Sequence, residues 1–136
     1  MTESTSNVLI VEDSDDCSET LELAFLTLKD VRLIIVRSAE EALEHFATNS
    51  VAALVTDIHL PGMDGLHLLA AVRALRLGTS VPAIVISGDS DPGTPARVLA
   101  AGADAFFSKP YSPAAVRRKL EELLAASGRN GHGTRN

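Results

Sequence analysis

Five polar side chains that could act together on a phosphoryl group stand directly after short apolar runs. Glu12 and Asp13 follow the run 8–11, Asp57 comes after 51–55, Ser87 after 82–86 and Lys109 after 105–107. If these runs are parallel strands, their carboxyl ends share one edge of a sheet, and the five side chains converge there. Carboxylates held close together repel one another, and their oxygen atoms, with room for water, suit a small hard cation such as Mg²⁺.

These residue types at one place indicate phosphoryl transfer. Lys109 supplies a fixed positive charge and Ser87 a hydroxyl donor, so with the cation they could neutralise the equatorial oxygens of a transferring phosphoryl group. Asp57 is then the natural nucleophile. Any one of these residues alone is typical of an ordinary solvated loop, and the hypothesis depends on their joint occurrence at strand ends.

The apolar runs predict five buried strands separated by amphipathic helices. The runs are rich in branched residues and cover 8–11, 31–36, 51–55, 82–86 and 105–107. Between them, apolar residues recur at helical spacing, as at Leu21, Ala24, Phe25 and Leu28, at Leu43 and Phe46, and at Leu66, Leu69 and Val72. Repeated strand–helix units with right-handed crossovers predict a doubly wound α/β fold around one parallel sheet.

Local signals also predict where helices begin and end. Three hydroxyl residues are placed as N-caps: Ser38 in a capping box with Glu41, Thr94 before Pro95, and Ser112 before Pro113. Three glycines predict helix ends, namely Gly78, Gly102 and Gly128.

Length and composition favour a single aliphatic domain. The chain has 136 residues, no Trp, and one cysteine, Cys17, which cannot form an intrachain disulfide and is assigned a helix-packing or surface role. The formal net charge of -6 argues against direct nucleic-acid binding. No leader-like or bilayer-spanning run is seen, so we expect a cytoplasmic location without membrane contact. We expect the domain to cover 7–126, with a disordered N-terminus at 1–6 and a disordered tail or linker at 127–136.

Four motifs in this chain resemble the receiver domain of bacterial response regulators, the CheY-like modules of two-component signalling. They are VLIVEDSDD after the first run, LVTDIHLPGMDG around Asp57, VISG around Ser87 and FFSKP around Lys109. The resemblance extends from about Asn7 to Ala126 and preserves the family's order and spacing. It implies a flavodoxin-like (βα)5 fold with strand order 2-1-3-4-5.

The resemblance also implies a role for each site residue. Asp57 is the phosphoacceptor, Asp13, Asp57 and the main-chain carbonyl of His59 ligate Mg²⁺, and Glu12 holds metal-bound water. Glu12 departs from the double-aspartate form of the motif, which leaves its direct coordination open. Lys109 and Ser87 hold the phosphoryl oxygens, while His59 and Asp89 flank the path of the attacking water and tune dephosphorylation.

Phe106 matches the family's switch aromatic. The resemblance implies that it turns inward when the Ser87 hydroxyl moves towards the phosphoryl group. Because phenylalanine has no hydroxyl, the coupling must depend on packing. Phe107 is expected to point to the opposite side and to join the core.

The partners follow from the same resemblance. A sensor histidine kinase or a histidine phosphotransfer protein is the expected donor, and a downstream protein is the expected target. A phosphorylation-dependent homodimer is a further hypothesis. The chain is expected to be a single-domain regulator that assists its own phosphoryl transfer and dephosphorylation and is not otherwise an enzyme.

Four alternatives compete with this interpretation. A phosphatase of the haloacid dehalogenase type needs Asp-x-Asp, but His59 stands where its general acid would be. A flavodoxin-like flavin module needs a phosphate-holding loop, whereas residues 12–16 are acidic. A docking-only receiver fold would not need the full set of phosphorylation residues that is present. The chain could also be the receiver fragment of a larger DNA-binding response regulator.

Overall fold

The computed structural model describes residues 5–75 and 80–133, with side chains described as far as Ser127. Strands and helices alternate along the described chain, as the apolar runs predicted. The five strands pair in parallel in the order β2-β1-β3-β4-β5, which confirms the predicted fold and strand order. Their bounds are β1 Ser6–Val11, β2 Val31–Val36, β3 Ala53–Asp57, β4 Ala83–Ser87 and β5 Ala105–Ser108.

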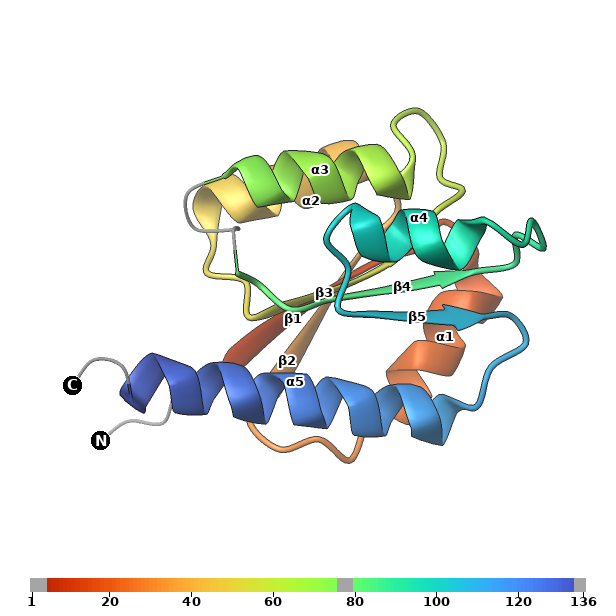
Figure 1. The fold of residues 1–136 in the computed structure, drawn as a ribbon. Helices are drawn as coiled ribbons and strands as arrows, with labels where there is room; N and C mark the ends of the chain where they lie inside the picture. Colours follow the sequence, from red (N-terminus) through yellow and green to blue (C-terminus); the bar gives the residue numbers. More distant parts are fainter. Residues whose placement is uncertain (1–4, 76–79, 134–136) are drawn as a thin grey trace.

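In the described part of the chain, five helices cover the two faces of the sheet. In Figure 1, α2, α3 and α4 lie above the sheet, and α1 and α5 lie below it. The helices run over α1 Asp15–Ala24, α2 Ala39–Thr48, α3 Gly65–Ala74, α4 Thr94–Ala100 and α5 Pro113–Gly133. Because every strand is parallel, all five carboxyl ends meet at one edge of the sheet, as the arrowheads of β4 and β5 show.

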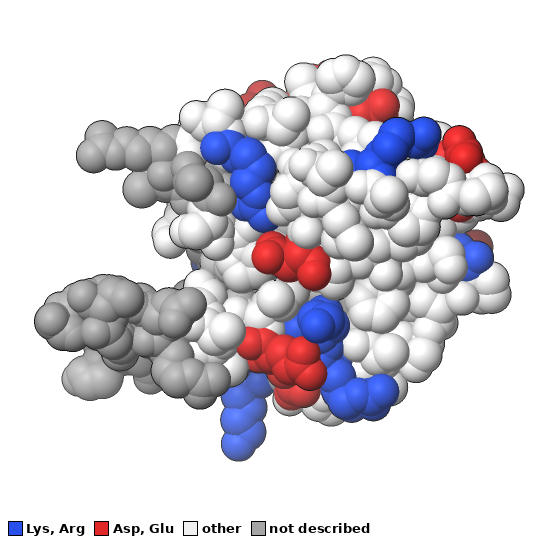
Figure 2. Space-filling view, viewed as in Figure 1, with Lys and Arg blue, Asp and Glu red and all other residues white. Residues whose placement is uncertain are grey.

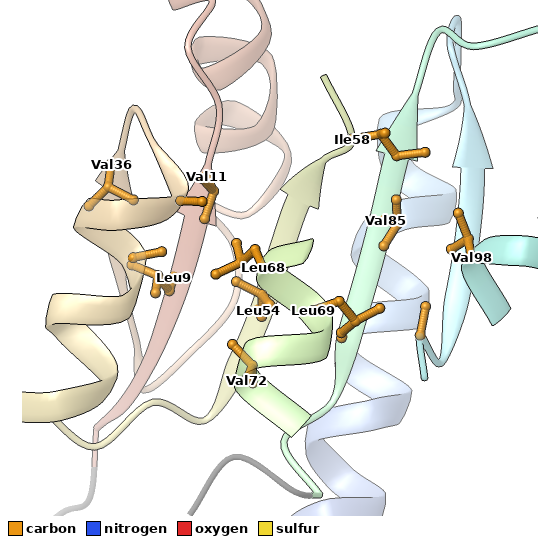
Figure 3. Close-up of a cluster of buried hydrophobic side chains, with 14 residues drawn as sticks. Leu9, Val11, Val36, Leu54, Ile58, Leu68, Leu69, Val72, Val85 and Val98 are labelled. Carbon is orange, nitrogen blue, oxygen red and sulfur yellow. The ribbon is translucent and has the colours of Figure 1, made fainter. Parts of the chain in front are cut away.

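Two aliphatic cores result from the alternation of side chains along each strand. Leu9 and Val11 of β1 belong to the core under α2, α3 and α4, which also contains Leu54, Leu68 and Val98 (Figure 3). Their neighbours Val8 and Ile10 face α1 and α5, where they pack with Leu21, Phe25, Val116 and Leu120. Residues buried on both faces make the three inner strands β1, β3 and β4 nearly continuous apolar runs, which explains why the sequence revealed them.

The structure corrects three predicted boundaries. Thr94 is not an N-cap: α4 has Gly93 at that position, and the buried Thr94 hydroxyl accepts a hydrogen bond from Arg97 at 3.1 Å. The last helix does not end at Gly128, because α5 continues to Gly133. Strand β1 begins at Ser6, within the segment expected to be disordered. The predicted stop at Gly78 lies outside the described residues, as do positions 1–4 and 134–136.

The other boundary signals behave as predicted. Ser38 Oγ accepts from the Glu41 N–H at 3.2 Å, and Ser112 Oγ accepts from the Ala115 N–H at 3.2 Å. Gly102 follows α4 with a φ of 111°, a backbone conformation that favours glycine.

Arg73, in the last turn of α3, contacts the loops before β4 and β5 at the edge of the sheet opposite the carboxyl ends of the strands. Its guanidinium donates to the carbonyl of Val81 before β4 at 2.6 Å and to the carbonyl of Gly102 before β5 at 2.7 Å. It also lies 3.4 Å from the Asp104 carboxylate, and the Arg73 side chain is only 19% exposed. One charged group therefore satisfies main-chain acceptors of two loops.

We expect Arg73→Ala to lower the free energy of unfolding by about 2 kcal/mol, because it leaves partly buried carbonyls without their charged donor. Urea unfolding measures the change. Arg97→Ala is the matched control on the more exposed α4, where we expect a change within about 0.5 kcal/mol. Equal losses in the two variants would contradict this role for Arg73.

Candidate functional site

The carboxylate of Asp57 lies at the centre of the predicted site. Asp57 is the last residue of β3, the middle strand, and it is buried. Lys109, just after β5, places Nζ 2.7 Å from Asp57 Oδ2, and the His59 N–H donates to Oδ1 at 3.2 Å. The Lys109 N–H in turn donates to the Ser87 carbonyl at 2.9 Å, which fixes the start of the Lys109 loop against β4.

Glu12 and Asp13 follow β1, the strand next to β3, but they differ in burial. Glu12 is 4% exposed, and its Oε1 lies 3.5 Å from Lys109 Nζ, while Oε2 accepts from the Ser14 N–H at 3.1 Å. Asp13 is exposed at the rim of the site. The structure therefore brings two buried carboxylates to one ammonium group, with a third carboxylate beside them in the chain.

The charges of these groups perturb one another. Burial raises the pKa of Glu12; the Ser14 N–H and Lys109 oppose this effect, and the charges of Asp57 and Asp13 add to it. Burial would lower the pKa of Lys109, but its hydrogen bond to Asp57 and its attraction to Asp57 and Glu12 raise that pKa well above the ordinary lysine value. Lys109 is thus firmly protonated, while negative charge at the site exceeds what one lysine neutralises.

Ser87, His59 and Asp89 border this centre. Ser87 ends β4 and is fully buried, and its Oγ accepts from the Asp89 N–H at 3.0 Å. His59 Nε2 lies 3.4 Å from Asp89 Oδ2, with the imidazole largely exposed. The pKa of Asp89 is lowered, chiefly by the Asp91 N–H and further by His59. The two residues predicted to flank the attacking water therefore contact each other.

Comparison with known proteins decides the family. A family model for the response regulator receiver domain matches residues 8–121. The chain belongs to this family. It is 26% identical over 125 residues to a chemotaxis protein CheY homolog of Campylobacter jejuni, a match that covers 91% of this chain and 96% of that relative. It is also similar to a putative response regulator from Chloroflexus aurantiacus, whose crystal structure has 31% sequence identity and a TM-score of 0.82 over 90% of this chain and 99% of the other.

Receiver domains also occur within much longer proteins. The chain is 27% identical over 121 residues to the sensory/regulatory protein RpfC of Xanthomonas campestris. That match covers 88% of this chain but 17% of RpfC. The similarity therefore concerns the receiver domain alone.

The two phenylalanines of β5 lie on opposite sides of this receiver domain. Phe106 packs against the core beneath α2, α3 and α4, and Phe107 packs against the core formed with α1 and α5. The prediction that they diverge is confirmed. Both side chains are only partly buried, so Phe106 is placed at the border between core and surface.

The structure adds neighbours that the sequence patterns did not identify. Cys17 Sγ lies 3.5 Å from Lys109 Nζ, so the thiol borders the site as well as belonging to α1. Arg37 and Glu40, near the start of α2, reach the loops after β1 and β3. Their partners are more than twenty residues away in the chain, and neither lies in a motif that marks such a contact.

The surface charge is mixed on the face drawn in Figure 2. There, Lys and Arg side chains lie beside Asp and Glu side chains, so the described residues of this face form no continuous basic stripe. No helix in the described part of the chain has the length and apolar character needed to cross a bilayer.

We expect Glu12→Gln to stabilise the metal-free receiver domain at neutral pH. A raised folded-state pKa means that the wild type is most stable, relative to the unfolded chain, below the ordinary glutamate pKa of about 4.3. That stability is lost as pH rises through the folded pKa. Glutamine stays neutral at every pH, so the variant does not lose this stability. Its free energy of unfolding should therefore rise relative to that of the wild type as pH passes through the pKa of Glu12, and stay higher at neutral pH.

Urea unfolding in a chelator at several pH values tests this prediction. Glu22→Gln, at an exposed position of α1, is the control for loss of one surface carboxylate. A Glu12→Gln variant that is less stable than the wild type at neutral pH would show that the ionised carboxylate stabilises the fold.

Proposed function

We propose that this receiver domain accepts a phosphoryl group on Asp57 from a phosphohistidine of a sensor kinase or a histidine phosphotransfer protein, with Mg²⁺ required. The observation that carries the proposal is the buried Asp57 carboxylate at the end of the middle strand, held by the Lys109 ammonium 2.7 Å away. A carboxylate in this position is an anionic nucleophile whose orientation is fixed by the His59 N–H. The proposal applies equally to a domain that acts alone and to one within a longer regulator.

The transfer requires little of the protein beyond positioning and charge. An Asp57 oxygen forms a bond to phosphorus as the bond from phosphorus to the donor nitrogen breaks. Lys109 then moves from the carboxylate to a phosphoryl oxygen, and the Ser87 hydroxyl donates to another. Ser87 Oγ accepts from the Asp89 N–H at 3.0 Å, and a hydroxyl that accepts one hydrogen bond can still donate its own proton to a phosphoryl oxygen.

The donor set at the site suits Mg²⁺. Receiver domains generally bind Mg²⁺ in the active site, and the receiver domain of sensor histidine kinase PA1611 from Pseudomonas aeruginosa PAO1 has a magnesium ion coordinated in its active-site cleft. Here the buried carboxylates of Glu12 and Asp57, with that of Asp13 beside them in the chain, carry more negative charge than Lys109 alone neutralises, and a cation would relieve it. Among the described residues, no three His, Cys, Asp or Glu side chains are grouped to hold a metal ion.

A site completed by main chain and water is consistent with that finding. We assign Asp13, Asp57 and the His59 carbonyl as ligands and Glu12 as the holder of metal-bound water. When bound, Mg²⁺ supplies positive charge that neutralises the transferring phosphoryl group.

The output of the domain follows from the position of Phe106. Movement of Ser87 towards the phosphoryl group would open space beside β5, which Phe106 can fill because it lies at the border of the core. The changed face of α4, β5 and α5 would then bind a downstream protein or a second copy of the domain. We propose a cytoplasmic phosphoacceptor that promotes its own phosphorylation and dephosphorylation, with no separate enzymatic substrate.

Incubation with acetyl phosphate, with and without Mg²⁺, tests the proposal by intact mass. We expect the gain of one phosphoryl group when Mg²⁺ is present and none when it is chelated. If neither a phosphoryl group nor the stable mimic beryllofluoride binds, the domain is a docking module and the proposal is wrong.

A further inference from the structure

The junction between β2 and α2 contacts both loops that carry the proposed metal ligands. Arg37, the first residue after β2, places Nη2 2.7 Å from the main-chain carbonyl of Asp13 and Nη1 2.5 Å from Asp15 Oδ1. The planar guanidinium thus spans the loop after β1 with two hydrogen bonds in a fork. One of them holds the backbone of Asp13 itself.

Arg37 is in turn fixed to the start of α2. Its N–H donates to Glu41 Oε1 at 2.9 Å, while the Glu41 N–H donates to Ser38 Oγ at 3.2 Å. These bonds order the helix start, so the Arg37 side chain begins from a defined backbone position.

Glu40, on the same helix start, reaches the other loop. Its Oε2 accepts from the Met63 N–H at 3.3 Å, in the segment that follows Asp57 and His59. At Gly62, with a φ of 75°, an added Cβ would lie 3.0 Å from Glu40 Oε2, so the loop and the carboxylate are in close contact. The same helix start therefore holds the loops after β1 and after β3.

We propose that Arg37 is a positioning residue for Mg²⁺, whose forked guanidinium holds the Asp13 loop in register with the loop that follows Asp57. This inference rests on the proposed function, since it concerns the same metal site. Among the described residues, Arg37 bonds to Asp13, Asp15 and Glu41 and not to Asp57 or Lys109, so it would act through the Asp13 backbone. Neighbours that orient metal ligands commonly change metal affinity about 10- to 100-fold when removed.

The direction in which Mg²⁺ affinity changes when Arg37 is removed distinguishes a positioning role from a purely electrostatic one. The positive charge of Arg37 lies beside the site, so its removal makes the surroundings more negative and by itself attracts a cation more strongly. Loss of positioning has the opposite effect and weakens Mg²⁺ binding. A positioning role therefore predicts weaker binding in a variant that is more acidic than the wild type.

Three variants of the full chain carry the test: Arg37→Ala, Arg37→Lys and, as control, Arg32→Ala. Arg32 is exposed on β2, the strand that precedes Arg37, and its removal changes the net charge equally. Calorimetric titration with Mg²⁺ alone, at constant ionic strength, gives the dissociation constant. The Mg²⁺ dependence of phosphorylation by acetyl phosphate gives a second readout, and thermal unfolding verifies the fold.

We expect Arg37→Ala to raise the Mg²⁺ dissociation constant about 10-fold, with the phosphorylation rate at saturating Mg²⁺ nearly unchanged. Arg37→Lys should recover little of the loss, because one ammonium group cannot reproduce the fork, and Arg32→Ala should match the wild type. Unchanged or tighter binding by Arg37→Ala, or full recovery by lysine, overturns the inference while leaving the proposed function intact. A wild type that neither binds Mg²⁺ nor becomes phosphorylated overturns both.

Discussion

Asp57→Asn is expected to gain no phosphoryl group from acetyl phosphate at any Mg²⁺ concentration, whereas the wild type gains one. The amide has no anionic oxygen to attack phosphorus, and it also removes one proposed anionic ligand of the metal. Its size is unchanged, and its carbonyl oxygen can still accept from the His59 N–H that now binds Oδ1 at 3.2 Å. Loss of activity would therefore reflect lost chemistry within a preserved fold.

Asp16→Asn is the matched control for this experiment. Asp16 lies in the first turn of α1, is exposed, and loses the same unit of charge on substitution. We expect it to be phosphorylated like the wild type, with intact mass measured for all three proteins under identical conditions. An Asp57→Asn protein that still takes up one phosphoryl group would mean that another side chain is the acceptor.

Gly65→Ala is expected to lower the free energy of unfolding by about 3 kcal/mol or more. Gly65 begins α3, and its N–H donates to the Ile58 carbonyl at 2.7 Å. A Cβ added there would lie 2.0 Å from the Asp57 carbonyl oxygen and 2.9 Å from the Ile58 Cα, a contact with main-chain atoms that cannot rotate away. The start of the helix would have to move away from the end of β3, where Asp57 lies.

The predicted loss of stability in Gly65→Ala is informative because helix propensity alone predicts that alanine would stabilise α3. In an unobstructed helix, alanine is more stable than glycine by roughly 0.5–1 kcal/mol. Gly93→Ala is the control: Gly93 has a φ of −83°, and its added Cβ meets nothing nearer than 3.7 Å. We expect that variant to stay within about 0.5 kcal/mol of the wild type in urea unfolding. If Gly65→Ala proves as stable as Gly93→Ala, the close approach of α3 to β3 is not a constraint.

Sequence patterns predicted those parts of the fold that depend on residues close together in the chain. Strands buried on both faces are mostly apolar, so β1 and β3 are visible as apolar runs that lead to Glu12 and Asp57. The Ser38 cap was predictable because its donor, the Glu41 N–H, is three residues away. The side chains of the site were predictable as a group because parallel strands bring their ends to one edge.

The wrong predictions concern signals that more than one local structure can satisfy. A threonine before a proline can be an N-cap or the first residue of the helix, and Thr94 takes the second option with its hydroxyl buried against Arg97. A glycine can end a helix or be tolerated within it, and α5 continues through Gly128. Packing against the rest of the chain chooses between such options.

The sequence by itself determined the fold class, the receiver family and the set of residues at the strand ends, because these depend on residue type and on spacing along the chain. Only the tertiary structure decided that Lys109 pairs with Asp57 and Glu12, that Arg37 holds the Asp13 backbone, and that Gly65 leaves no room for a Cβ. Electrostatic and steric energies depend on distance, and between residues far apart in sequence that distance is set by the register of the sheet and the packing of helices upon it.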